Sequence, residues 1–361
     1  FIGQRHWCNQ MLSFFLMTDN FSCPKPNGMT DRFFEELKSQ LANKDFNIRK
    51  MIPMAGGMNN QSYRLVSDDD KSLFLKIYAK DERNRLTREY GAYSYLRGES
   101  FNDVPVPIYK SDLLNYGVYS FEVGRIKKVE ELTQSDLKKM ADFVIKLQQL
   151  RPPYDKFPSA VKATFSNEEF SQRINNRLNH FSTYLSTREL DSEVKVFVNY
   201  IDLIEVLKKQ LTKLFERRPG IQDNSNLRID QRCLSSADFG PHNIIMKKNG
   251  DFIYFDFEYF GWDDPANILA MFLTDEKSKD LDEKSKDFII QYYKKHSTLP
   301  SQLTERLEIM ISAFKIDWIA LILDSLSPDR MKHYLEANPK LESTLFVQGQ
   351  IDKIKRLLKG I

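Results

Sequence analysis

The sequence has little cysteine and no long apolar run, and both features exclude classes of protein. Its three cysteines, Cys8, Cys23 and Cys233, are odd in number and lack the CxxC spacing of zinc and redox sites. We therefore expect neither a disulfide framework nor structural zinc, and we expect a reducing, cytoplasmic location. No stretch approaches the roughly 18 consecutive apolar residues that a membrane helix requires, so membrane insertion is not expected.

The chain also lacks a charge excess and the signatures of several nucleotide-binding classes. It has 53 basic and 50 acidic residues, so nothing indicates the concentrated basic face of a nucleic-acid-binding protein. It contains neither GxxxxGK[ST] nor a regular GxGxxG. DFE at 256–258 replaces the DFG of protein kinases, and no A-P-E follows, which disfavours a protein kinase. Only about seven residues separate Asp256 from the "DDP" that begins at Asp263, too few for an activation loop.

What the chain does contain is a β-rich first part followed by an α-rich second part. Alternating apolar residues predict strands at 47–54, 62–66, 73–80 and 116–124. Periodic apolar residues predict helices after Thr30, over 81–98 and after Thr133, and mostly helical structure beyond residue 124. The sequence therefore predicts an α+β fold with a cleft between two lobes.

The predicted lobes divide the chain near residue 123. Residues 29–123 form the β-rich N-terminal lobe and residues 124–361 the larger, mostly helical C-terminal lobe. Met29 opens a segment that resembles an ordinary first helix. Residues 1–28 are therefore interpreted as an extension, poorly ordered and without a role in the chemistry.

The strongest chemical signal lies between residues 236 and 257. Asp238 and Asn243 have the D-x-x-x-x-N spacing of kinase catalytic loops, in which the Asp accepts the proton of the substrate hydroxyl and the Asn binds Mg²⁺. Asn249-Gly250 predicts a two-residue hairpin turn between apolar strands. This hairpin would return Asp256 toward Asn243, so that both could ligate one Mg²⁺.

Complementary residues occur in the first part of the chain. Lys76 is predicted in a strand and Glu89 in the next helix, the arrangement with which kinases hold nucleotide phosphates, although Glu82 could pair with Lys76 instead. The turn "AGGMNNQ" contains Gly56, Gly57, Asn59 and Asn60, and its glycines allow backbone N–H groups to approach phosphates. Each feature alone has a plain alternative, a surface ion pair or an ordinary turn. Their joint order favours a kinase.

With these motifs the sequence resembles the aminoglycoside phosphotransferase and choline kinase-like superfamily of small-molecule kinases. The resemblance covers residues 47–325 and is most specific over 236–270. The family patterns H-G-D-x-x-x-x-N, I-D-[FW]-E and D-P-x-x-D-L-A correspond to "SADFGPHN", "YFDFE" and "DDPANILA". The resemblance implies a protein-kinase-like two-lobe fold and transfer of a phosphoryl group from ATP, with Mg²⁺, to a hydroxyl of a small molecule.

The resemblance also implies roles for individual residues. Asp238 becomes the catalytic base, Asn243 and Asp256 the Mg²⁺ ligands, and Lys76 and Glu89 the phosphate-binding pair. "SFEVG" resembles the hinge between the lobes, whose backbone around Glu122 and Val123 would hold adenine. His242 is interpreted as a residue that packs the loop or lies near phosphate.

Two positions depart from the family pattern. Ser236 stands in place of the usual His, whose main role is to support the catalytic loop by hydrogen bonding, and Ser could do part of that work. The alternative is a catalytically weak or inactive pseudokinase with a regulatory or scaffold role. Ile268 replaces an Asp, so Asp263 or Asp264 would have to supply its structural hydrogen bond.

The acceptor is not identified by the sequence. Aminoglycosides, choline and other amino alcohols, sugars and cell-envelope precursors all remain open, and so does the oligomeric state. The aromatic and acidic stretch after Asp256 suggests a pocket for a cationic or polyhydroxyl acceptor, and packing of the helical core is its alternative. The candidate acceptor residues are Glu258, Trp262, Asp264 and, on a later predicted helix where a solvated face is the alternative, Asp317.

Overall fold

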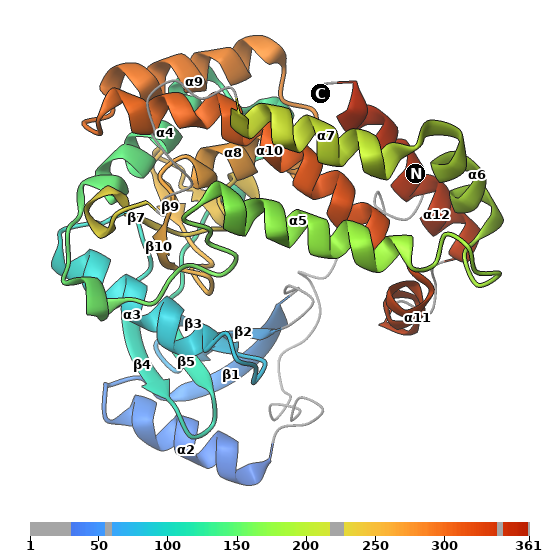
Figure 1. Ribbon diagram of the computed structural model, residues 1–361. Helices are drawn as coiled ribbons and strands as arrows, with labels where there is room; N and C mark the ends of the chain where they lie inside the picture. Colours follow the sequence, from blue (N-terminus) through green and yellow to red (C-terminus); the bar gives the residue numbers. More distant parts are fainter. Residues whose placement is uncertain (1–29, 55–59, 217–226, 338–341, 360–361) are drawn as a thin grey trace. The chain divides into compact units, whose positions relative to one another are not determined.

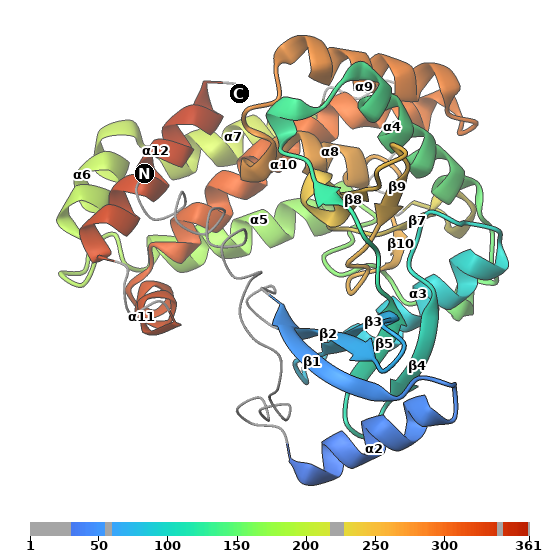
Figure 2. The same ribbon diagram turned by 180° about the vertical axis from the view of Figure 1, so that it is seen from behind.

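The computed structural model describes residues 30–54, 60–216, 227–337 and 342–359 (Figures 1 and 2). The predicted extension, residues 1–28, lies outside this part. The chain divides into two compact units. Among the described residues, the first contains those up to Lys80 together with Val106–Phe121, and the second contains Asp81–Pro105 together with those from Glu122 onward.

In its described residues the first unit consists of an antiparallel sheet, as the alternating pattern predicts, and the helix α2 (Asp31–Ala42). The sheet has the order β1-β2-β3-β5-β4. Its strands are β1 (Ile48–Met54), β2 (Gln61–Ser67), β3 (Ser72–Ile77), β4 (Pro107–Ser111) and β5 (Tyr116–Ser120). In this register Lys76 lies opposite Ser62 on one side and Gly117 on the other, which places it inside the sheet rather than at an edge.

Helix α2 (Asp31–Ala42) builds the core of the first unit. Thr30 caps it as predicted, since the Thr30 side chain accepts a hydrogen bond from the amide of Phe33. The buried residues of α2 recur every four positions and pack with apolar side chains of the strands. They are Phe33, Leu37 and Leu41, packed with Leu65, Leu75 and Val118 among others.

The second unit is mostly helical (Figures 1 and 2). Its helices of eight or more residues are α3 (Arg85–Gly98), α4 (Gln134–Gln149), α5 (Asn167–Ser182), α6 (Ser192–Ile201), α7 (Leu203–Glu216), α8 (Asn267–Thr274), α9 (Glu283–His296), α10 (Ser301–Ser325), α11 (Pro328–Ala337) and α12 (Ser343–Leu358). Two small sheets accompany them. One pairs β7 (Cys233–Ser235) with β10 (Gly261–Asp263), and the other has the order β6 (Arg125–Ile126), β8 (Ile244–Met246), β9 (Phe252–Tyr254).

Helix α3 differs from its prediction in its first residue and in the compact unit to which it belongs. It begins at Arg85 rather than at residue 81, after Asn84 in a left-handed conformation with φ 51°. Glu89 is buried, whereas the next residue, Tyr90, is only half-buried. The helix also belongs to the second compact unit, although the sequence placed it in the N-terminal lobe.

The predicted hairpin between β8 and β9 is present, but its loop is one residue longer. Lys247 and Asp251 pair, since the Lys247 amide donates to the Asp251 carbonyl at 2.8 Å, and the Gly250 amide donates to the Lys247 carbonyl at 3.0 Å. Gly250 has φ 86°, which a residue without Cβ adopts without strain. The loop is therefore a three-residue turn with Gly250 at its left-handed position, rather than the two-residue turn expected from Asn-Gly.

The α+β fold class is confirmed, with the antiparallel sheet in the first part of the chain and the helices in the second. Helix α4 is capped as its sequence predicted, by Thr133 and Asp136 in a reciprocal capping box. Among the helices in the described ranges, none combines the length and the apolar character needed to cross a membrane.

Candidate active site

The segment that contains Asp238 is a strained turn at the end of β7. β7 pairs with β10, and the chain then turns at Ala237, which has φ 63°. The Asp238 amide donates to the carbonyl of Ser236 at 2.8 Å, and the hydroxyl of Ser235 accepts the amide of Ala237 at 3.0 Å. A left-handed alanine costs about 1–2 kcal/mol, so the surrounding structure holds this conformation in place.

The carboxylate of Asp238 is paired with His242, a contact that the sequence interpretation of His242 missed. Nε2 of His242 lies 3.1 Å from Oδ1 of Asp238. Nδ1 of His242 is buried and has no hydrogen-bond partner among the described residues, so the tautomer with the hydrogen on Nε2 satisfies the ring best. A Cβ on Gly240 would lie 2.9 Å from the imidazole ring, so the glycine leaves space for it.

His242 also affects the ionisation of Asp238. Burial raises the pKa of Asp238, but the hydrogen bond and the charge of His242, with Lys277 and Asn243, outweigh burial. The pKa of Asp238 therefore lies below its ordinary value. The carboxylate is ionised at neutral pH, as a hydroxyl-orienting base must be.

Asn243 connects Asp238 to the segment that carries Asp256. Its Nδ2 donates to the backbone carbonyl of Asp238 at 2.9 Å, which leaves Oδ1 as the amide oxygen that could ligate a cation. Its own backbone carbonyl accepts the amide of Phe255 at 3.0 Å. The hairpin thus returns the chain beside Asn243, and Asp256 follows directly.

Asp256 is held by a residue that the sequence interpretation did not assign to the site. The Asp256 backbone has φ 66°, and its amide donates to the hydroxyl oxygen of Tyr93 at 2.9 Å. The same hydroxyl donates to Oε1 of Glu89 at 2.8 Å. Tyr93 follows Glu89 by four residues on α3, so both face the same side of the helix, and this spacing was the available signal.

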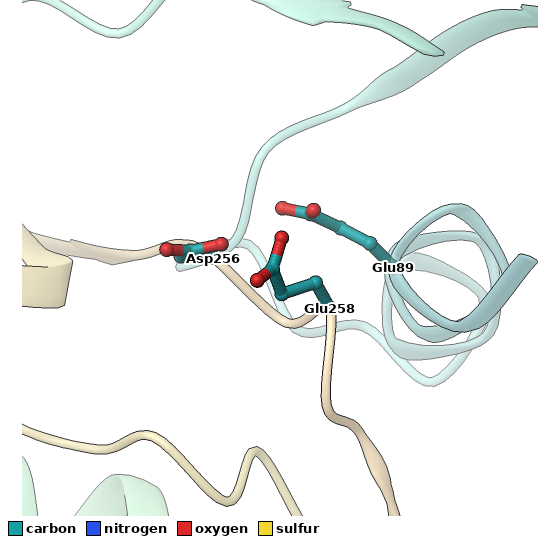
Figure 3. A group of neighbouring side chains, drawn as sticks. All are labelled: Glu89, Asp256 and Glu258. Carbon is teal, nitrogen blue, oxygen red and sulfur yellow. The ribbon is translucent and has the colours of Figure 1, made fainter. Parts of the chain in front are cut away.

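Three carboxylates converge at this point (Figure 3). One oxygen each from Glu89, Asp256 and Glu258 lies within 4.8 Å of the other two. Arg85 forms an ion pair with Glu258 and compensates one of the three negative charges. The remaining charge and the hard oxygen donors fit a divalent cation such as Mg²⁺. Glu258 thus lies in this carboxylate group, whereas the sequence placed it in the acceptor pocket.

Lys76 lies in the first compact unit. It is 6% exposed and lies near the end of β3, and its Nζ lies 5.0 Å from the ring centroid of Tyr78. A solvated strand lysine, the plain alternative, is therefore wrong. Glu82 is exposed and precedes α3, whereas Glu89 is buried. The pairing of Lys76 with Glu89 stays a prediction.

Of the other residues predicted to contact the nucleotide phosphates, only some belong to the described part of the chain. Gly56, Gly57 and Asn59 lie outside the described residues. Oδ1 of Asn60 accepts the amide of Ala79 at 3.2 Å, so this side chain ties together the ends of β2 and β3.

The predicted hinge coincides with a boundary between the compact units, which falls between Phe121 and Glu122. The Glu122 side chain forms an ion pair with Lys247 at 2.9 Å, and Val123 is 67% exposed. The side chain of Glu122 thus has a structural contact of its own, and only the backbone of this segment is proposed for adenine binding.

The remaining acceptor candidates are buried and paired. Trp262 is 3% exposed and donates to the carbonyl of Tyr154, so the alternative of core packing is favoured. Asp264 is 1% exposed, forms an ion pair with Arg306 and accepts the amide of Ala266. These contacts are those of a structural residue.

The sequence also assigned roles to Asp317, as an acceptor candidate, and to Asp263, as a possible replacement for the acid that is missing at position 268. Asp317 is paired with Arg173 and Arg177 on α5, so the alternative of a solvated helix face is wrong. Asp263 accepts hydrogen bonds from the Asn267 side chain and the Asp264 amide. Asp263 and Asp264 therefore supply hydrogen bonds at the start of α8, where Ile268 replaces the acid of the family pattern.

Ser236 does not support the catalytic loop through its hydroxyl. Its side chain is buried, and its Oγ has no hydrogen-bond partner within the described parts of the chain. The loop is supported instead by the hydroxyl of Ser235 and by the backbone carbonyl of Ser236. The expectation that the Ser236 hydroxyl partly replaces the missing histidine is therefore wrong.

Known structures share this fold. A spectinomycin phosphotransferase in complex with ADP and spectinomycin aligns with a TM-score of 0.58 at 11% identity, covering 89% of this chain and 93% of that one. A streptomycin–ATP–APH(2")-IIa ternary complex aligns with a TM-score of 0.57 at 17% identity, covering 88% of this chain and 99% of that one. An ethanolamine kinase of Plasmodium vivax aligns with a TM-score of 0.56 at 14% identity, covering 90% of this chain and 84% of that one. At these identities the likeness concerns the fold.

The comparison at the sequence level identifies the family. No curated protein matches the chain. Residues 50–303 match the phosphotransferase enzyme family, a range that includes all but the first two residues of the sheet of the first unit, the Asp238 loop and the three converging carboxylates. The chain belongs to the phosphotransferase enzyme family.

Proposed function

We propose that the protein transfers the γ-phosphoryl group of ATP to a hydroxyl group of a small molecule. The acceptor oxygen attacks the γ-phosphorus, and the bond from that phosphorus to the β,γ-bridging oxygen breaks. ADP leaves with the bonding electron pair, and Asp238 accepts the hydroxyl proton. Catalysis then consists mainly of positioning and charge neutralisation.

The observation that carries this proposal is the pair of Asp238 and His242. The contact at 3.1 Å fixes the direction of the carboxylate, and the lowered pKa keeps it ionised. An oriented, ionised carboxylate can hold an acceptor hydroxyl in line for attack and take its proton as the bond forms. A structural turn Asp would need neither property.

The converging carboxylates support a cation site beside the base. Asn243 through Oδ1 and Asp256 would hold Mg²⁺, with Glu89 and Glu258 close to Asp256. Bound there, the ion would neutralise charge on the transferring phosphates. Tyr93 fixes the backbone of Asp256 and the carboxylate of Glu89, which keeps the donor set in place.

The nucleotide contacts are proposed from the family and from the similar structures. Two of the structures named above contain ADP or ATP, and the chain has residues suited to that ligand. Lys76 would contact the phosphates, steadied by Glu89. The turn that contains Gly56, Gly57, Asn59 and Asn60 would cover the phosphates with its backbone. The backbone of Glu122 and Val123 would hold the adenine.

A coupled assay of ADP release tests this function. The full chain is incubated with ATP, with and without Mg²⁺, and with sugars, amino alcohols and aminoglycosides in turn. We expect acceptor-dependent ADP release that requires Mg²⁺. ATP hydrolysis that no acceptor accelerates, or release without a divalent cation, contradicts the proposal.

A pseudokinase with a regulatory or scaffold role is the second candidate. Ser236 favours it, because the family's supporting histidine is absent and the Ser236 hydroxyl has no hydrogen-bond partner among the described residues. The two candidates differ in one measurement. Tight Mg²⁺-ATP binding without phosphoryl transfer to any acceptor class would favour the pseudokinase, and transfer excludes it.

A further inference from the structure

The acidic residues predicted to attract a cationic acceptor are each paired with an arginine. Arg85 pairs with Glu258, Arg306 with Asp264, and Arg173 and Arg177 with Asp317. The side chains that surround Asp317 carry a net positive charge. Three cations, Lys162, Arg173 and Arg177, gather with Asp317 and are called the basic cluster below.

The basic cluster is built from α5, α10 and the loop before α5. The two helices lie against each other (Figure 1). Nη2 of Arg173 lies 3.2 Å from Oδ2 of Asp317, and Nη1 of Arg173 donates to the carbonyl of Lys162 at 2.6 Å. Arg177 contacts the other oxygen of Asp317. The two arginine side chains are each 16% exposed and Lys162 is exposed, so a ligand can reach all three cations.

The positive charge of the basic cluster is not balanced by the acids around it. Asp317 is one carboxylate for three cations. The other acid that acts on Arg173 is Asp263, and burial raises the pKa of Asp263 to about 7, so at neutral pH it carries only part of a charge. Although its side chain reaches the surface, nearby protein atoms desolvate the Lys162 ammonium, and this effect together with the charge of Arg177 lowers its pKa. Burial likewise lowers the pKa of Arg173, and an added anion would stabilise the charged forms of both side chains.

Two further features indicate a site prepared for a ligand. Nε of Arg173 is buried and has no hydrogen-bond partner among the described residues, although the guanidinium of a purely structural arginine is normally saturated. Lys162 has φ 70°, an unfavourable conformation for a lysine. Strain of this kind persists where the surroundings hold a side chain in a functional position.

The basic cluster is attached to the segment that follows Asp256. The amide of Val161, next to Lys162, donates to the carbonyl of Tyr259 at 3.1 Å. Tyr259 follows Asp256 by three residues. Two more guanidinium groups, those of Arg83 and Arg85, lie 5.7 and 5.3 Å from the centroid of the Tyr259 ring. The loop that carries Lys162 is therefore joined through the backbone to the segment that follows Asp256, one of the three converging carboxylates.

We propose that the basic cluster binds an oxyanion group of the acceptor, so that the substrate is a hydroxyl compound that already carries a phosphate or a carboxylate. This inference rests on the proposed function. Arginine side chains bind both groups through paired N–H donors, which explains the use of two arginines with one lysine. A polycationic aminoglycoside or choline would be repelled by the same cations.

Calorimetric titration of the full chain tests the charge of the acceptor directly. Glycerol 3-phosphate and glucuronate are the anionic probes, choline the cationic probe and glucose the neutral one. All titrations contain excess Mg²⁺-ADP to occupy the nucleotide site. We expect an anionic probe to bind at least about tenfold more tightly than choline or glucose, and the stronger of the two anions identifies the group as phosphate or carboxylate.

Variants distinguish anion binding at the basic cluster from a nonspecific effect of the protein's positive charge. Lys162→Asn suits the left-handed backbone and removes one cation, and Arg177→Gln leaves Arg173 to pair with Asp317. Each should weaken binding of the anionic probe about tenfold or more, whereas Lys209→Asn, at an exposed lysine of α7, should not. Asp317→Asn removes the competing carboxylate and should tighten binding. A merely structural network would lose stability without gaining affinity.

The outcomes distinguish this inference from the proposed function, because ADP release is measured with the same four compounds and with kanamycin. Turnover of choline or kanamycin, without binding of either anion, overturns the anionic acceptor and leaves the kinase. Binding of an anion that depends on Lys162 and Arg177, without ADP release from any compound, supports the site and contradicts the kinase. Equal anion affinity in Lys162→Asn and the parent chain overturns the inference.

Discussion

Nε2 of His242 lies 3.1 Å from Oδ1 of Asp238, and this contact lowers the pKa of the carboxylate that we propose as the base. The two residues are four apart, and His242 lies in a short 3₁₀ turn, Pro241–Asn243. The histidine is therefore a positioning residue. It acts on the acceptor only through Asp238.

His242→Ala should move the acidic limb of the pH profile of kcat/KM to higher pH. Without His242 the pKa of Asp238 rises toward its ordinary value, and the active, ionised form is lost sooner as pH falls. The stability that the depressed pKa contributes, present at neutral pH and lost as pH falls through the folded-state pKa, should decrease as well. Loss of orientation should lower kcat by about tenfold to a hundredfold.

His242→Gln is the matched control, because its amide retains a donor. It should restore part of the rate and part of the pH profile. A pH profile of kcat/KM in His242→Ala identical to that of the parent would remove His242 from the site.

The two serines before Asp238 should respond in opposite ways to the loss of their hydroxyls. Ser235→Ala leaves the buried amide of Ala237 without its acceptor, and we expect a loss of about 1–3 kcal/mol in the free energy of unfolding, with reduced kcat. Ser236→Ala removes a buried hydroxyl that has no partner among the described residues, and it should be neutral or stabilising, with kcat unchanged. Urea unfolding and ADP release check both. A larger loss in Ser236→Ala than in Ser235→Ala would contradict the assignment.

Ala237→Gly should stabilise the protein. The left-handed conformation at φ 63° costs alanine more than glycine, and the extra freedom of glycine in the unfolded chain offsets only part of this gain. We expect the free energy of unfolding to rise by about 0.5–1 kcal/mol. Ala141→Gly, within α4, is the contrasting substitution and should lower the same quantity by about 1 kcal/mol. A decrease in both variants would show that the turn is not strained.

Tyr93→Phe should weaken the response to Mg²⁺ without disrupting the fold. The hydroxyl joins the amide of Asp256 to the carboxylate of Glu89, and residues that orient metal ligands typically affect metal affinity tenfold to a hundredfold. We expect the Mg²⁺ concentration for half-maximal ADP release to rise by about tenfold. Tyr95→Phe, two residues further along α3, is the control. Equal Mg²⁺ dependence in both variants would exclude the proposed role of Tyr93.

Much of the local structure follows from short-range signals in the sequence. Thr30 and Thr133 are helix caps in sequence and in structure, because a cap is defined by a hydrogen bond across only a few residues. The hairpin that brings Asp256 back beside Asn243 was predicted from its turn residues, although its loop is one residue longer.

The contacts that define the environment of the site were not predictable in this way. The pairing of Asp317 with Arg173 and Arg177 joins α5 to α10 across roughly 140 residues, and no local pattern encodes which helices pack together. The sequence showed acids after Asp256 and favoured a cationic or polyhydroxyl acceptor. The partners of those acids, which reverse the local charge, come from distant segments. Ser236 was misjudged for the same reason, since burial without a partner is visible only in the folded chain.

The most direct test of the central claim is the rate of ADP formation by Asp238→Asn with the best acceptor found, measured together with Mg²⁺-ATP affinity on the same protein. The isosteric amide keeps the shape of the site but can neither accept the hydroxyl proton nor carry the charge. We predict that kcat falls by a factor on the order of 10² or more while ATP affinity stays within about threefold. Near-parental turnover in Asp238→Asn would contradict the assignment of Asp238 as the base.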